Sequence, residues 1–265
     1  MTTLWERVLK LDAVHNFRDY GGWRAADGAR VATGRLFRSA HHAHATEGDV
    51  ERIGRLGILT VTDLRHPEEQ REEPSAWIGK LAFGVIEEPE EDQGVKGEAP
   101  HIAAFRNSDF SPQSMRAFMI THYGEMPYDP RHVAMFRRYF DALASQDGGI
   151  LIHCAAGKDR TGILAALTHH VLGVHPDDAL EDYLLSNEAG NIAKRLPRLR
   201  RNMEKRYNRV IAEEAMHALL TVEEAYIARC WAALGEKSGS VDAYLTDMLG
   251  VDEGKRRLIR EKLLS

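Results

Sequence analysis

The sequence predicts an α/β fold with an all-helical C-terminal part. Short aliphatic or β-branched runs at 58–62 and 150–152 have the length and composition of buried strands, and each follows a segment with helical spacing of apolar residues. From 175 to 265 every segment reads as helix. A chain of 265 residues fits one large domain or two small ones, and we expect a single domain over 1–265.

The first third of the chain begins with a polar loop at 11–22 and continues into a short strand at 34–39. Thr46 and Asp49 have the spacing of a capping box, with Asp in place of the usual Glu or Gln. A helix is therefore expected to begin after Thr46, and Gly57 can end it before the next strand.

The middle of the chain, 87–130, carries an acidic run, several glycines and prolines, and only weak periodicity. A stretch of this length is usually a lid or a binding loop, and part of it, 114–123, has the spacing of a helix. Apolar residues at helical spacing resume at 131–143, and an apolar helix is expected at 163–172.

The C-terminal part, 175–265, is expected to be a helical extension packed on the core. Pro176 suits the first position of a helix because its missing N–H would be unpaired there in any case. Further amphipathic helices are expected at roughly 192–206, 209–219, 222–234, 241–249 and 253–264.

Composition excludes several classes of protein. The net charge of −5 and the pI near 6.2 make nucleic-acid binding a poor fit. No apolar run approaches the roughly 18 residues of a membrane helix, and the N-terminal segment lacks the pattern of a signal peptide. Two cysteines exclude a disulfide scaffold and a thiolate zinc site. We expect a cytoplasmic protein, although export without a signal peptide is compatible with the same residues.

The strongest motif is HCAAGKDRTG at 153–162, between the strand 150–152 and the helix 163–172. A loop that opens into a helix directs free backbone N–H groups inward, and the helix dipole adds positive potential, so this loop suits phosphate. Gly157 permits the tight turn. Arg160 lies in the first helical turn, and a guanidinium binds two phosphate oxygens at once.

Cys154 occupies the floor of this predicted cradle. The N–H groups, the dipole and Arg160 should favour its thiolate, which would face a bound phosphorus as an in-line nucleophile. Thr161 can donate a hydrogen bond to the sulfur and help it leave again. The alternative is a buried cysteine that acts only as a small apolar residue, which the surrounding letters disfavour.

The loop resembles the signature of the cysteine-dependent protein tyrosine phosphatase superfamily. Segments 16–22 (NFRDYGG), 36–40 (LFRSA) and 63–65 (DLR) resemble its bacterial PtpB-like tyrosine/lipid phosphatase branch, and 183–187 (YLLSN) also fits. That branch usually has Leu where this chain has Tyr20. The resemblance runs from about residue 12 to the C-terminus and is weakest in the predicted lid.

This resemblance implies a phosphatase-type sheet flanked by helices, a helical lid, and no metal or other cofactor. It implies Cys154 as the nucleophile and Arg160 as the phosphate clamp. The backbone that would cradle the phosphate runs through Ala155, Ala156, Gly157, Lys158, Asp159 and Arg160. The implied substrate is a phosphorylated protein or a phosphoinositide.

The general acid has several candidates. Asp159 is favoured because it lies inside the loop next to Arg160 and because the branch uses the aspartate at this position. Asp63 is second, since it ends a strand, where active-site residues of open α/β sheets gather. Asp129 could approach with the lid.

Lys158 is interpreted as a second cation at the rim, suited to a multiply phosphorylated headgroup, with a plain surface lysine as the alternative. Other charged side chains of the pattern are expected to hold the loop in place rather than touch substrate; they are Arg18, Asp19, Arg38 and Arg65. His153 is expected to support the nucleophile structurally.

Three further features receive simpler interpretations. The histidines of 41–44 are expected in a solvated loop rather than at a metal, since no thiolate or acidic ligands accompany them. Cys230 lies on a helical pattern and is expected in the core. The basic run 194–201 is expected on a solvated helix face, with contact to an anionic lipid or an acidic partner as the alternative.

The function predicted from these residues is metal-independent phosphomonoester hydrolysis, with protein phosphotyrosine as the leading substrate. A phosphoinositide or dual-specificity phosphatase is the alternative within that class. Two other classes compete: a catalytically silent phosphate-binding module, and a sulfur-transfer enzyme with a similar cysteine loop. The intact Cys154, Asp159 and Arg160 disfavour the first, and the spacing of Cys, Arg and Thr disfavours the second.

Overall fold

The computed structural model describes residues 4–88 and 108–265. Its centre is a five-stranded sheet in the order β1-β2-β5-β3-β4. The antiparallel edge strand β1 pairs with β2, and the remaining pairs are parallel. The strands are β1 (Arg18–Asp19), β2 (Leu36–Ser39), β3 (Ile58–Asp63), β4 (Gly84–Ile86) and β5 (Gly149–His153).

The register of the parallel strands brings three strand ends together at one edge of the sheet. Ser39 of β2 and Asp63 of β3 both stand opposite His153 at the end of the central strand β5. The carboxyl ends of three strands therefore meet at one edge, which is where open α/β sheets build their sites.

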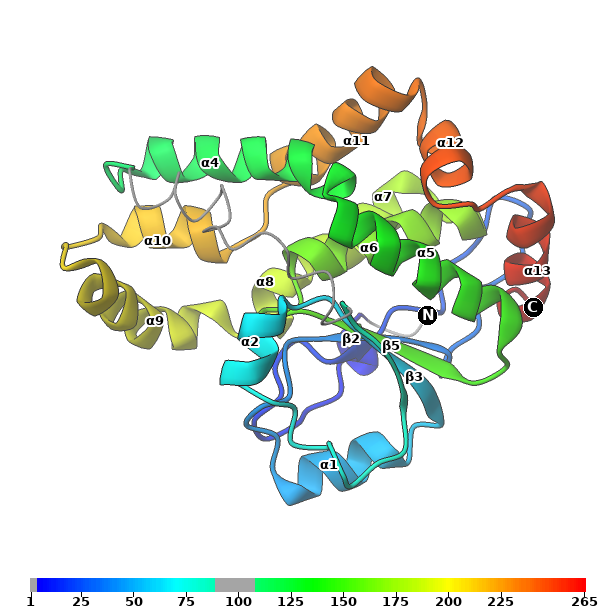
Figure 1. Cartoon of the computed structure of the whole chain (residues 1–265), viewed down its shortest axis with the longest axis horizontal. Helices are drawn as coiled ribbons and strands as arrows, with labels where there is room; N and C mark the ends of the chain where they lie inside the picture. The colour runs from blue at the N-terminus through cyan, green and yellow to red at the C-terminus, as the bar shows by residue number, and fades with distance from the viewer. Residues whose placement is uncertain (1–3, 89–107) are drawn as a thin grey trace.

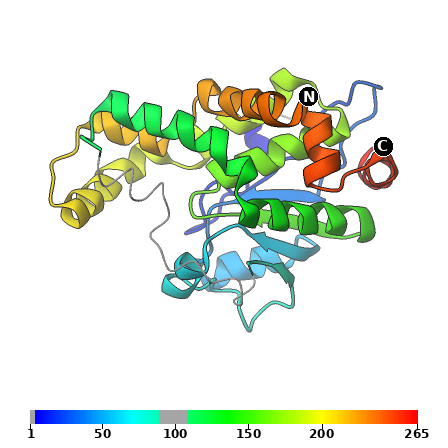
Figure 2. The same ribbon diagram turned by 45° about the horizontal axis from the view of Figure 1, so that its top comes forward.

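Helices cover both faces of the sheet (Figures 1 and 2). The small α1 (Glu47–Gly54) packs on one face together with Trp77. The opposite face carries the main core, which includes residues of α5 (Pro130–Ser145), α6 (Asp159–Leu172) and α11 (Glu224–Ser238). The other helices of the core side are α7 (Pro176–Leu184), α8 (Ser186–Ala189), α12 (Val241–Ala243), η4 (Tyr244–Met248) and α13 (Glu253–Leu263).

Three helices project from this body as an arm, at the left of Figure 1. They are α4 (Pro112–Glu125), α9 (Ile192–Tyr207) and α10 (Glu213–Leu220). A separate apolar cluster joins them, with Met115, Leu196 and Met216 among its buried members. The predicted helix at 114–123 is thus confirmed and longer than expected, whereas 89–107 of the predicted lid lies outside the described residues.

Local sequence signals account for several helix ends. Thr46 and Asp49 form the expected capping box, and the Asp49 carboxylate also accepts hydrogen bonds from the backbone N–H groups of Asp12 and Ala13. Pro176 stands in the first turn of α7 as predicted. α6 ends at Gly173 with a φ of 75°, a left-handed conformation that glycine adopts without strain.

The predicted helix at 241–249 is confirmed over 241–248, where the short α12 continues into the π-helical turn η4. Sequence analysis missed β1, β4, the 3-10 turns η1 (Leu4–Arg7) and η3 (Met126–Tyr128), and α2 (Pro67–Glu72). Elements this short give no usable periodicity. Over the described ranges, no helix combines the length and apolar character needed to cross a bilayer.

Candidate active site

The predicted phosphate loop connects β5 to α6 at the functional edge of the sheet. Its turn depends on Gly157, which has a φ of 68°. A Cβ atom at this position would lie 2.2 Å from the carbonyl oxygen of Ser39, so the loop packs against β2 too closely for any other residue. The sequence assigned this role to Gly157 correctly.

The carbonyl oxygens of the loop are bound from outside. The side-chain amide of Asn16 donates to the carbonyl oxygens of Gly157 (2.8 Å) and Ala156 (3.3 Å), and Arg38 also donates to Gly157 (3.0 Å). The backbone N–H of His41 donates to the carbonyl of Ala155 at 3.2 Å. With its carbonyls turned outward, the loop leaves its N–H groups for a bound anion.

Cys154 begins this loop and is 2% exposed. Thr161, in the first turn of α6, is buried, and within the described ranges its hydroxyl has no hydrogen-bond partner. Buried hydroxyls normally have a partner, so this free hydroxyl is suited to the predicted hydrogen bond to sulfur.

Arg160 is fixed by an acidic side chain that sequence analysis missed. Its Nη1 and Nη2 donate to the two carboxylate oxygens of Glu69 (2.7 and 3.1 Å), and Nη1 also donates to the carbonyl of Leu64 (2.8 Å). Three of the five N–H donors of the guanidinium are thereby used. The Nε–H and the second N–H of Nη2 have no partner among the described residues, and together they have the geometry to bind two phosphate oxygens.

The ion pair between Arg160 and Glu69 also keeps both side chains charged. Burial alone would lower the pKa of Arg160, but Cys154 and Glu69 outweigh burial and raise it, so the cation is permanent. Burial would raise the pKa of Glu69, but the hydrogen bonds and charge of Arg160 lower it to about 2. Glu69 also accepts a hydrogen bond from the backbone N–H of His66. The sequence signal for the short helix that carries Glu69 is Pro67, which suits a first helical position after β3.

Asp159 lies at the mouth of the loop, where α4 contacts the core. One of its carboxylate oxygens, Oδ1, accepts hydrogen bonds from the Tyr123 hydroxyl (2.7 Å) and the Lys158 ammonium (3.0 Å). Tyr183 donates to the Tyr123 hydroxyl at 2.8 Å. Burial keeps the pKa of Tyr123 well above its usual value, so the phenol remains a hydrogen-bond donor. The other oxygen, Oδ2, has no partner in the described part of the chain.

Lys158 does not stand at the rim as predicted. Lys158 is 6% exposed, and its ammonium donates to the carbonyl oxygens of Leu219 (2.8 Å) and Thr221 (3.3 Å) as well as to Asp159. The lysine therefore ties the phosphate loop to the end of α10. The position of Lys158 could not be predicted because the carbonyls that bind it lie about sixty residues further along the chain.

The other two candidate acids are held in ion pairs. Both oxygens of Asp63 accept from Arg65, and burial, which would raise the pKa of Asp63, is outweighed by His153 and Arg65, which lower it to about 2. Asp129 caps α5 and pairs with Arg131 at 2.8 Å, which holds its pKa far below the usual value despite burial. Neither group carries a proton near neutral pH.

A buried charge network supports the loop from below. The carboxylate of Asp182 on α7 binds Arg18 (3.0 Å) and Arg38 (2.7 Å), and all three side chains are at most 3% exposed. Arg38 in turn holds the carbonyl of Gly157. Arg18 and Arg38 are thus placed beneath the loop, as the structural interpretation predicts, and Asp182 is a partner that the sequence did not reveal.

The segment 41–44 is not the fully solvated loop that the sequence predicts, because His42 is fully buried. The indole of Trp77 donates to its Nδ1 at 2.8 Å, so the neutral ring carries its proton on Nε2 and donates to Ser39 (2.9 Å). His42 also stacks on His153, with ring centroids 4.8 Å apart. Over the described ranges, no group of three or more acidic, histidine or cysteine side chains is arranged to hold a metal.

Acid should destabilise the fold in two stages. Burial lowers the pKa of His153 to about 4, below the unfolded value of about 6.5, so the stability contributed by neutral His153 is lost as pH falls between these values. Asp63, with a pKa of about 2, loses its contribution below the unfolded value of about 3.9. Urea midpoints measured at pH 7.5, 5 and 3 should therefore fall at each step, and equal midpoints at pH 7.5 and 5 would contradict the assignment of His153.

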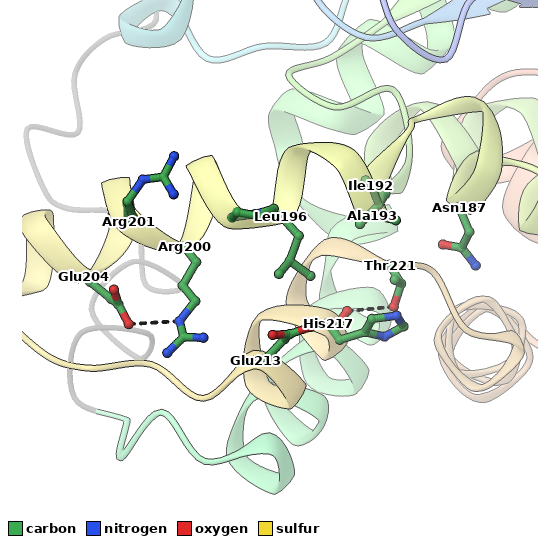
Figure 3. Close-up of a pocket in the computed structure, with 11 residues that line it drawn as sticks. Asn187, Ile192, Ala193, Leu196, Arg200, Arg201, Glu204, Glu213, His217 and Thr221 are labelled. Carbon is green, nitrogen blue, oxygen red and sulfur yellow. Dashed lines mark hydrogen bonds and ion pairs between the residues drawn. The ribbon is translucent and has the colours of Figure 1, made fainter.

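A groove of about 620 Å³ lies between α9 and α10 (Figure 3). Asn187 and Thr221 line it, and the carbonyl of Thr221 binds Lys158. Along the groove, Leu196 supplies apolar surface, and Arg200 forms an ion pair with Glu204 at 3.0 Å.

Comparisons with known proteins identify the family of this chain. A model of the tyrosine phosphatase family matches residues 9–265. A Cupriavidus necator protein, provisionally named a tyrosine-protein phosphatase, is 34% identical over 94% of this chain and 86% of its own length. The triple specificity protein phosphatase PtpB of Mycobacterium tuberculosis is 28% identical over 92% of this chain and 97% of its own length. Two solved structures of TpbA from P. aeruginosa align at 21% and 22% identity with TM-scores of 0.33 and 0.34, covering 61% and 62% of this chain and 77% and 78% of theirs. The chain belongs to the tyrosine phosphatase family.

Proposed function

We propose that this protein hydrolyses phosphomonoesters, protein phosphotyrosine above all, without a metal and through a phosphocysteine at Cys154. The observation that carries the proposal is the polarity of the loop 154–160. Its carbonyls are bound from outside, and Arg160 keeps a two-donor edge free within the described ranges. Such a loop stabilises an oxyanion next to a buried cysteine.

In the first step the Cys154 thiolate attacks phosphorus, and the S–P bond forms as the bond to the leaving oxygen breaks. The backbone N–H groups of the loop and the free edge of Arg160 bind the three equatorial oxygens, whose charge rises in the transition state. Glu69 keeps Arg160 oriented, so little orientational freedom is lost during the reaction.

Asp159 is proposed as the general acid that protonates the leaving oxygen. In the second step a water attacks phosphorus, its proton returns to Asp159, and the S–P bond breaks to release phosphate and the thiolate. Oδ2 of Asp159 is available for the proton, because Tyr123 and Lys158 both donate to Oδ1. Asp63 is the less suitable acid, since Arg65 binds both of its oxygens.

The direct test is phosphate release by the purified protein in the presence of chelator, from a phosphotyrosine peptide and a phosphoinositide at equal concentration. Faster release from the peptide, inhibited by vanadate, is expected. Faster release from the lipid would favour the second candidate, a phosphoinositide or dual-specificity phosphatase. Release from neither would favour a silent phosphate-binding module.

Asp159→Asn should slow hydrolysis of substrates with poor leaving groups by about 10²–10⁴-fold, the usual contribution of a positioned acid. A good leaving group needs no proton, so its release should be affected much less. The measurement is kcat/KM for a series of aryl phosphates, with Asp63→Asn as the comparison. If Asp159→Asn keeps the wild-type dependence on leaving group and Asp63→Asn changes it, the acid is Asp63.

A further inference from the structure

Two buried tyrosines form a chain of hydrogen bonds behind the proposed general acid. Tyr183 on α7 donates to the Tyr123 hydroxyl (2.8 Å), and Tyr123, in the last turn of α4, donates to Oδ1 of Asp159 (2.7 Å). Tyr123 and Tyr183 are 0% and 1% exposed, whereas the side chain of Asp159 is 22% exposed. The chain therefore runs outward from the core and ends on the carboxylate.

The carboxylate fixes the direction of both hydrogen bonds. An ionised carboxylate only accepts hydrogen bonds, so the single proton of the Tyr123 hydroxyl points to Asp159. The Tyr123 oxygen is left to accept from Tyr183, which stays protonated because burial and the charge of Asp159 hold the pKa of Tyr183 well above its usual value. Rotation of the carboxylate away from Tyr123 would leave a buried phenol without its acceptor, which is costly.

Packing holds the two rings in place. Tyr123 and Tyr183 both belong to the main core, where their rings meet edge to face with centroids 6.4 Å apart. Tyr183 also lies against the first turn of α6, where a Cβ atom on Gly162 would be 2.9 Å from its ring. The Tyr123 hydroxyl is therefore a fixed point to which the carboxylate is attached.

Lys158, the other donor to Oδ1, is less suited to set the orientation of Asp159. Its ammonium is shared with the carbonyl oxygens of Leu219 and Thr221. An ammonium on a flexible stem acts as a point charge with rotatable donors, so it imposes little direction on its acceptor. The phenol of Tyr123, in contrast, presents one proton from a packed ring.

We propose that Tyr123, supported by Tyr183, is a positioning residue that orients Asp159 for proton transfer at Oδ2. The proposal rests on the proposed function, with Asp159 as the general acid. Neither tyrosine touches the substrate or exchanges a proton during the reaction. Because Tyr123 holds Oδ1, Oδ2 is the oxygen that carries the proton to the leaving group in the first step and receives one from water in the second.

The test is kcat/KM for aryl phosphates of graded leaving-group ability, measured per folded molecule. Tyr123→Phe should lower kcat/KM for poor leaving groups by about 10- to 100-fold, the cost of a misplaced catalytic group, and should change it little for good ones. Tyr183→Phe should show the same pattern with a smaller loss, and it tests the same chain of hydrogen bonds if Tyr123→Phe does not fold.

Tyr226→Phe is the matched control, because it removes a hydroxyl from the same cluster of rings. Tyr226 is fully buried, and its ring centroid lies 5.6 Å from that of Tyr123. Its hydroxyl bonds to the carbonyl of Ala218 (2.9 Å) and the carboxylate of Glu223 (3.2 Å) instead of Asp159. Tyr226→Phe should therefore keep the wild-type dependence on leaving group, even where it lowers stability.

A double-mutant cycle separates positioning from packing. In Asp159→Asn protein, addition of Tyr123→Phe should change kcat/KM for a poor leaving group by less than about twofold, because the acid that Tyr123 orients is gone. Full additivity of the two substitutions, or an equal loss for good and poor leaving groups, would overturn the positioning role while hydrolysis by the wild-type protein stands. No hydrolysis of any aryl phosphate by the wild-type protein would refute the proposed function, and the positioning role with it.

Discussion

Replacing Asp182 with alanine should lower the free energy of unfolding by about 3–5 kcal/mol, the usual cost of removing one partner from a buried ion pair. Asp182 is 2% exposed and forms ion pairs with both Arg18 and Arg38, which are fully buried. Without the carboxylate, two guanidinium groups would face each other in the core. The measurement is urea unfolding followed by circular dichroism at neutral pH.

The matched control is Glu181→Ala, which removes the adjacent, exposed carboxylate of the same helix. An exposed substitution of this kind should change the free energy of unfolding by about 0.5 kcal/mol or less. Arg38 also binds the carbonyl of Gly157, so any Asp182→Ala protein that folds should lose catalytic rate as well. Equal stability of the two variants would show that the network does not hold the loop.

Cys154→Ser should reduce phosphomonoester hydrolysis by about 10³-fold or more, a loss comparable with removal of other catalytic nucleophiles. A serine hydroxyl is not ionised near neutral pH, so it is a much weaker nucleophile than a thiolate. The carbonyls of the loop remain bound by Asn16, Arg38 and His41, so binding of a phosphate analogue should persist. Kinetics and vanadate binding by the same preparation measure both properties.

The second cysteine provides the control. Cys230 is fully buried in the main core, where burial raises its pKa to about 12, so it stays a neutral thiol. Cys230→Ala should therefore retain the wild-type rate per folded molecule while losing some stability through the cavity it leaves. Near wild-type turnover by Cys154→Ser would refute the mechanism.

Local patterns predicted the centre of the fold well. The strand 150–152 and the helix 163–172 lie within β5 and α6, because a buried aliphatic run and an apolar helix each leave a strong signal in sequence. The loop between them was predicted from its residue types and its place between strand and helix, and Gly157 has the positive φ that its turn requires. Capping at Thr46 followed the same local logic.

Partners that are distant in sequence could not be predicted. Glu69 reaches Arg160 across 91 positions, and Tyr123 reaches Asp159 across 36. Nothing in one sequence shows which carboxylate or phenol the fold brings to a loop. Lys158 was misassigned for the same reason, because its side chain is bound by carbonyls at the end of α10.

The central claim is that Cys154 carries the phosphoryl group during turnover. It is tested most directly by acid quenching of Asp159→Asn protein during hydrolysis of p-nitrophenyl phosphate, followed by mass spectrometry of the Cys154 peptide. A good leaving group departs without an acid, whereas the second step needs Asp159 as base, so phosphocysteine should accumulate. The account predicts one phosphoryl group on Cys154, and none in the same variant with Cys154→Ser. Turnover with Cys154 unmodified at every time point, or with the phosphoryl group on another residue, would contradict it.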